Sequence, residues 1–392
     1  MTEGPRNPFI YKPQLGLAPP AKMPGVNEPC WCGSGVKYKK CHRDRESKAE
    51  ANPFADSAKM RTASKKGRCL HPDSGGGHCG STAIGSHTVQ KNGGLKAIAE
   101  EGHVLTTFVG FEDIQKANGA PEPKRMGVND ASTFPGFCNK HDTELFAPIE
   151  GSSLNLGPKE AFLFLYRSHC LELARKRVVV GHLPTFKKMD SGKPMQAQFA
   201  IQDGMRAYEQ GLLLSLTSME AEKNDMDGAL LSENWADVHY CQVEFDGLLP
   251  LTTTCGFYPE FDWDGNDLQD LSDLSQPGLP LSFTITSFEG YSSAILVWRG
   301  PQDDLRKQFV TSFLGVSDAE KAGRIAAFAF EVSENTQIKP SWWVGLPSSV
   351  RERLIAKTAH GTIVAQPEAS AMKDVAPLTS PLAVKSVLTS WA

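Results

Sequence analysis

No run of apolar residues in this 392-residue sequence approaches the roughly 20 residues that a membrane-spanning helix requires. The longest candidates, "LLLSL" and "RIAAFAFEV", are short and interrupted, so we expect no membrane partner. The first twenty residues, "MTEGPRNPFIYKPQLGLAPP", lack the apolar segment of a secretory signal and are rich in proline. We therefore predict a cytoplasmic protein that begins with a disordered arm over residues 1–26.

Three common catalytic signatures are also absent: the Walker phosphate-binding loop, the glycine fingerprint of dinucleotide-binding folds and the G-x-S-x-G elbow of serine hydrolases. The segment "DWDGND" has Asp267 where a calcium-binding EF-hand needs glycine, so it predicts a hairpin turn instead. The composition, 40% hydrophobic and 22% charged, is typical of a soluble globular protein. The length predicts two or three compact units.

The formal net charge of −4 is unevenly distributed. Residues 1–68 contain 14 Lys and Arg residues against 6 Asp and Glu residues, a net charge of +8, and the remainder carries −12. A basic segment can bind polyanions such as nucleic acid through phosphate contacts and counterion release. The alternative is that the basic segment is a solvated linker.

Cysteine is scarce, and its nine occurrences are unevenly spaced. An odd count without a secretory signal argues against a disulfide framework and favours metal ligation by the clustered members. Cys170, Cys241 and Cys255 lie in apolar surroundings and are predicted to be core thiols.

The first cluster follows the pattern C-x-C-x8-C-H and comprises Cys30, Cys32, Cys41 and His42. Zinc prefers four tetrahedral nitrogen and sulfur ligands, which three thiolates and an imidazole supply. The intervening segment "GSG" allows the tight turn that returns the chain to the metal. Neighbouring basic residues at positions 37, 39, 40 and 43 offset the excess negative charge of three thiolates. We predict a closed structural zinc site.

The stretch "PCWCGSGVKYKKCH" resembles the SEC-C motif, the small zinc-binding segment known from the protein-translocation ATPase SecA. The resemblance covers residues 27–45, and Trp31 stands where the family commonly has proline. It implies a recruitment module that binds a chaperone or the ribosome and that occurs beside many unrelated domains.

A linker over residues 46–66 is followed by a second cluster, for which we predict a Cys3His zinc site in a unit of treble-clef type over residues 67–150. Cys138 and His141 are spaced to share one face of a first helical turn. The other pair, Cys69 and Cys79, flanks a glycine-rich loop. Two alternatives remain open: His71 or His78 replaces one of these cysteines, or Cys69 and Cys79 are ordinary buried thiols.

The segment "AIGSHTVQKNGGL" between the two ligand pairs raises the question of catalysis. In outline the unit is similar to the zinc units of HNH endonucleases, in which a histidine activates water beside a divalent metal. The resemblance makes His87, Asn92 and His103 candidate catalytic residues, with Mg²⁺ or Mn²⁺ as cofactor. Three departures weaken it: the spacing of 58 residues between Cys79 and Cys138, the missing proline after the histidine, and the use of His141 as a zinc ligand. The alternative is a structural hydrogen-bonding role for His87.

Residues 151–362 are predicted to form an α+β domain with an antiparallel sheet, followed by a loose tail over 363–392. Helical periodicity marks residues 158–176, 200–223, 303–315, 317–335 and 346–359. Strand-like patterns mark residues 238–245, 248–258, 281–288 and 292–300. The order of helices, strands and helices indicates an α+β fold class.

From these patterns we expect a zinc-binding protein whose SEC-C-like segment recruits the body to the ribosome, nucleic acid or a chaperone. The first alternative is an HNH-like nuclease, for which anti-phage defence is a natural setting. The second is an adaptor whose acidic body binds another protein.

Overall fold

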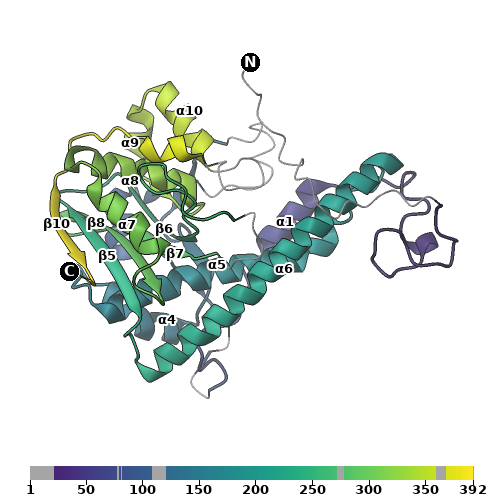
Figure 1. Ribbon diagram of the computed structural model, residues 1–392, viewed down its shortest axis with the longest axis horizontal. Helices are drawn as coiled ribbons and strands as arrows, with labels where there is room; N and C mark the ends of the chain where they lie inside the picture. The colour runs from purple at the N-terminus through teal and green to yellow at the C-terminus, as the bar shows by residue number, and fades with distance from the viewer. Residues whose placement is uncertain are drawn as a thin grey trace. The chain divides into compact units, whose positions relative to one another are not determined.

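The computed structural model describes residues 22–76, 79–80, 82–107, 121–271, 278–358 and 368–391 (Figure 1). The chain forms two compact units, one of residues 1–64 and 175–221 and the other of residues 65–174 and 222–392. This division differs from the expected boundaries, because the two long helices of the expected 151–362 domain each contribute to both units. Most of the expected N-terminal arm lies outside the described residues.

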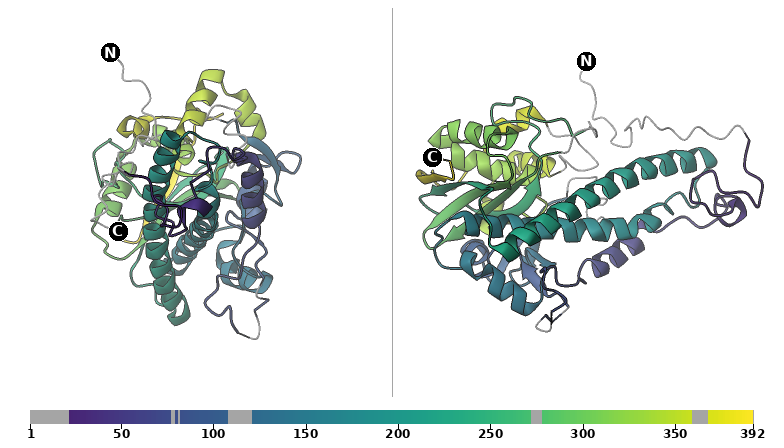
Figure 2. Two further views of the ribbon diagram at one scale, coloured as in Figure 1. Left: turned by 90° about the vertical axis from the view of Figure 1, so that its right-hand side faces the viewer. Right: turned by 60° about the horizontal axis from the view of Figure 1, so that its bottom comes forward.

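Among its described residues, the first unit combines the SEC-C-like segment with helices. It contains the short helix η2 (Tyr38–Lys40), α1 (Pro53–Ala63), the end of α5 (Pro158–Phe186) and the first part of α6 (Met195–Ser232). The ion pair Arg177–Glu220 connects the two long helices, which run side by side in Figure 2, and Lys187, just after α5, pairs with Glu209 on α6. We call residues 187–194, which join α5 to α6, the hairpin loop. Among the described residues, no helix combines the length and apolar character needed to cross a bilayer.

The second unit contains an antiparallel sheet, as predicted. The four predicted strands are found as β5 (Val238–Phe245), β6 (Leu251–Phe257), β7 (Leu281–Phe288) and β8 (Tyr291–Arg299). Every residue of β7 is buried, because helices cover both faces of the central strands. The fold class, a mixture of helices with antiparallel strands, is therefore confirmed.

The sheet extends beyond the predicted strands, in the order β10-β5-β8-β7-β6-β9-β2-β3. The additional members are β2 (His103–Thr106), β3 (Lys124–Gly127), β9 (Gln337–Ile338) and β10 (Val384–Thr389). The expectation of a loose tail is wrong for β10, which pairs with β5 from Val384 to Thr389. Most side chains of β10 are exposed, so backbone hydrogen bonds hold it at the edge and its sequence carries no alternating apolar pattern.

Two apolar cores lie on the two faces of this sheet. One is formed with α7 (Leu305–Gly315), α8 (Asp318–Val332), α9 (Pro340–Gly345) and α10 (Ser348–Lys357) (Figure 1). The other includes the part of α5 in this unit and α4 (Asn139–Phe146). The cap expected before α7 is present, since Asp304 accepts a hydrogen bond from the Arg306 amide, whereas Ser317 begins α8 without a side-chain cap.

Candidate metal centres

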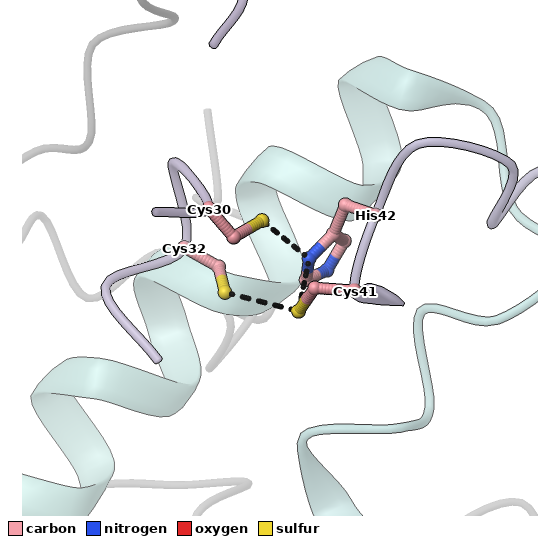
Figure 3. A group of neighbouring side chains, drawn as sticks. All are labelled: Cys30, Cys32, Cys41 and His42. Atoms are coloured by element: carbon pink, nitrogen blue, oxygen red, sulfur yellow. Dashed lines mark hydrogen bonds between the residues drawn. The ribbon is translucent and has the colours of Figure 1, made fainter. Parts of the chain in front are cut away.

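The four ligand candidates of the first cluster converge on one point. The Sγ atoms of Cys30 and Cys41 lie 3.2 and 3.1 Å from Nδ1 of His42, and the Sγ atoms of Cys32 and Cys41 are 3.6 Å apart (Figure 3). All four donor atoms lie within 4.8 Å of one another. Cys30 and His42 are buried, whereas Cys32 and Cys41 are half-buried. Three sulfurs and one imidazole nitrogen in this arrangement match the donor set of a structural zinc site.

The turn between the cysteines depends on its glycines. Gly33 and Gly35 have φ values of +76° and +70°, in the left-handed region that side chains with a Cβ rarely adopt. The amide of Cys30 then donates to the Val36 carbonyl at 2.8 Å, which closes the loop. The backbone thus aims Cys30 and Cys32 at the pair Cys41–His42, as the spacing predicts.

Burial and hydrogen bonding shift the thiol pKa values of the first cluster in opposite directions. Burial raises the pKa of the Cys30 thiol to about 12, so this residue needs a positive charge beside it to become a thiolate. Burial also opposes ionisation of Cys32, but hydrogen bonds with His42 and Ser34 outweigh it and lower the pKa to about 6. A divalent metal would supply the charge that Cys30 requires.

The second cluster also comes together. Nδ1 of His141 lies 3.3 Å from Sγ of Cys69 and 3.5 Å from Sγ of Cys138, while the Sγ atoms of Cys79 and Cys138 are 4.0 Å apart. These four donor atoms likewise lie within 4.8 Å of one another. The same donor set, three thiols and one imidazole, therefore occurs twice in the chain.

A strand pair and a helix position the second cluster. β1 (Gly85–His87) pairs antiparallel with β4 (Thr133–Pro135), and Cys138 is the N-cap residue of α4. Burial opposes ionisation of Cys138, but the backbone amides of His141 and Gly80 lower its pKa. Burial raises the pKa of Cys69 to about 11. Cys69 and Cys79 thus lie outside the helices and strands, and Cys138 and His141 lie at a helix start.

Of the ligands that the sequence left open at this site, the structure describes Cys69, Cys79 and His71. Cys69 and Cys79 both belong to the converging group, and His71 does not. The ring of His71 stacks on that of His141 with centroids 3.9 Å apart, and its Nδ1 accepts a hydrogen bond from the Asp73 amide. His78 lies outside the described residues.

The three candidate catalytic residues occupy separate elements. His87 ends β1, and its Nε2 is 3.0 Å from the Val128 carbonyl oxygen, while burial lowers its pKa. His103 begins β2, which belongs to the larger sheet rather than to the β1–β4 pair. Asn92 is exposed in the helical turn η3 (Lys91–Leu95). Among the described residues, neither histidine joins a metal-capable group of three or more side chains.

Sequence reasoning missed the residues of the hairpin loop and of α6 that contact His42 and Trp31. Nε2 of His42 lies 2.7 Å from Oδ2 of Asp190, and the ring of Trp31 packs 4.1 Å from that of Phe199. Asp190 is the one acidic residue in the basic hairpin loop sequence "KKMDSGKP". No spacing rule connects it with a histidine 148 positions earlier.

The family model of the SEC-C motif matches residues 27–44 of the chain. No curated protein and no solved structure matches the chain. The motif and the two cysteine–histidine groups together support a zinc-binding protein.

Proposed function

We propose that this chain is a cytoplasmic recruitment protein in which zinc stabilises both units. One zinc ion is held by Cys30, Cys32, Cys41 and His42, and a second by Cys69, Cys79, Cys138 and His141. The observation that carries the proposal is the convergence of four donor atoms inside the matched SEC-C segment. Three cysteines and a histidine complete a tetrahedral shell, so the metal has a structural rather than a catalytic role.

The recruited partner is the ribosome, nucleic acid or a chaperone. Exposed basic side chains surround the first zinc site, namely Lys37, Lys39, Lys40 and Arg43. The first unit as a whole has 18 Lys and Arg residues against 10 Asp and Glu residues, a net charge of +8. A surface of this kind favours phosphate-rich partners.

Elemental analysis of the purified full-length protein tests the zinc sites. We expect two zinc ions per chain, one for each ligand group. The double substitution Cys30→Ser and Cys32→Ser should remove one of them. Cys241→Ala, which alters a buried thiol outside both groups, should keep both. A wild-type protein with substantially less than one zinc ion per chain would contradict the proposal.

A second candidate function is an HNH-like nuclease, with anti-phage defence as its setting. Its support is that His87 ends β1, whose partner strand β4 directly precedes the ligand pair Cys138–His141. Cleavage of plasmid DNA and RNA with Mg²⁺ or Mn²⁺ should then be lost in His87→Ala. Equal cleavage by both proteins would dismiss His87 as the catalytic base, and no cleavage of either substrate would favour recruitment alone.

A further inference from the structure

Asp190 is a completely buried carboxylate beside the first metal site. Its Oδ2 lies 2.7 Å from Nε2 of His42 and accepts a hydrogen bond from Nε2 of Gln202 at 2.7 Å. The guanidinium of Arg45 contacts its Oδ1. A buried carboxylate of this kind is costly unless it is fully paired, and all of these partners lie in the first unit.

The arrangement fixes which nitrogen of His42 faces the thiols. Nδ1 lies beside Cys30 and Cys41, so the ring proton must be on Nε2, where it is donated to Asp190. Histidine ligands of metals commonly donate their second N–H to a carboxylate, which orients the ring and increases its basicity.

We propose that Asp190 is the positioning residue of the first metal site and that it couples metal binding to the fold of the hairpin loop. This inference rests on the proposed zinc site. Asp190 acts through His42 and does not itself bind the metal. Loading of the site therefore orders residues 187–194 together with the SEC-C segment.

Backbone contacts between the two segments support this coupling. The Gly192 amide donates to the Arg45 carbonyl at 3.0 Å, and Arg45 Nη2 donates to the Lys187 carbonyl at 3.1 Å. On α6, Arg206 donates to the backbone carbonyl of Cys32, itself a proposed ligand, at 3.1 Å. The hairpin loop thus contacts the SEC-C-like segment at His42 and Arg45, and α6 contacts it at Cys32.

Metal titration of the full-length protein with Co²⁺, followed by its thiolate and d–d absorption bands, tests the positioning role. The binding phase that disappears in the Cys30→Ser and Cys32→Ser double variant reports the first site. In Asp190→Asn, which keeps the shape and removes the charge, this phase should weaken by about 10- to 100-fold. The second site should keep its affinity and serves as an internal reference.

Gln198→Leu provides the matched structural control. Gln198 is buried and its side-chain amide donates to the Lys193 carbonyl at 2.7 Å, so the substitution removes a hydrogen bond to the same loop that involves neither Asp190 nor His42. It should change the Co²⁺ affinity of the first site by less than about twofold, since the ring orientation is untouched. Equal weakening by Gln198→Leu and Asp190→Asn would show a general loop defect and overturn the positioning role.

Hydrogen exchange of residues 187–194 tests the coupling. Chelation of the metal, or Asp190→Asn, should remove protection from the loop in the full-length protein, and unchanged protection would overturn the coupling. If the wild type lacks the phase that depends on Cys30 and Cys32, the zinc proposal itself fails and this inference with it. If that phase is present but Asp190→Asn has wild-type affinity, only the inference fails.

Discussion

Trp31 stands at a position where SEC-C motifs commonly have proline. Its ring lies 4.4 Å from that of His42 and 4.1 Å from that of Phe199 on α6, measured between centroids. The indole therefore packs between His42 and α6, and aromatic contacts of this kind contribute more than their buried area alone. This departure from the family pattern adapts the motif to packing against α6.

Replacing Trp31 with the proline of the family should separate packing from metal binding. None of the four ligands changes, so Trp31→Pro should keep two zinc ions per chain. Loss of the aromatic contact should destabilise the first unit by about 1–3 kcal/mol, less than a fully buried tryptophan, because Trp31 is only half-buried. Limited proteolysis in the segment that follows residue 45 measures this loss.

The control for this variant is Val36→Ala in the same segment. Val36 is 44% exposed, so this substitution should leave the stability of the first unit unchanged. Loss of zinc in Trp31→Pro would contradict the separation. Wild-type resistance to proteolysis would show instead that the indole contributes nothing to packing.

The four residues of the first cluster could be predicted from the sequence. The carboxylate that contacts His42 could not. Cys30, Cys32, Cys41 and His42 lie within one local turn, so their spacing alone specifies the site. Asp190 reaches His42 only because α5 and α6 place the hairpin loop beside the SEC-C segment. Side-chain hydrogen bonds between distant parts of a chain leave no periodic pattern in it.

At the level of secondary structure, the two cysteine–histidine groups differ in the elements that they connect. Cys69 and Cys138 are members of the apolar core that also contains Phe137 and Tyr166. The proposed second site therefore joins the β1–β4 pair and α4 to one of the two apolar cores of its unit. The first site connects a short turn to one helical hairpin.

Cys138→Ser and Cys30→Ser should consequently destabilise the protein in different ways. Because metal binding is coupled to folding, Cys138→Ser should unfold the region of β1, β4 and α4 and lower the melting temperature of the second unit. Cys30→Ser should leave the second unit folded and release the SEC-C segment. Circular dichroism melts of both variants measure this difference, and an equal loss of thermal stability would contradict it.

The strands that the sequence predicts are those with a buried apolar pattern. β7 is buried along its whole length, and β5 and β8 are buried except at a few positions, so their composition identifies them. β9 has only two residues, and β10 is mostly exposed. These edge and bridging strands depend on backbone pairing with neighbours, which their own sequences do not encode.

At the scale of the whole molecule, charge is divided between the two units. The first has a net charge of +8, and the second, with 23 Lys and Arg residues against 35 Asp and Glu residues, has −12. Nucleic acid should therefore bind the first unit, while the second repels it. The adaptor alternative would instead use the acidic unit to bind a basic protein.

Binding of single-stranded RNA at several salt concentrations tests this division. Affinity should fall steeply with salt, and Lys39→Glu with Lys40→Glu should weaken binding and reduce the slope of log K against log salt by about 1–2, one contact per lysine. Lys373→Glu alters an exposed lysine of the second unit and should have little effect. Binding that is weak and independent of salt would favour a chaperone or another protein as the partner.

The sequence separation between His42 and Asp190, 148 residues, has a consequence for how the protein is made. A nascent chain exposes all four ligands of the first site before α5 and α6 have been translated. A metal bound to the proposed zinc site at that stage would meet an imidazole that still lacks its carboxylate partner. We therefore expect the proposed site to retain zinc better once synthesis has passed residue 190.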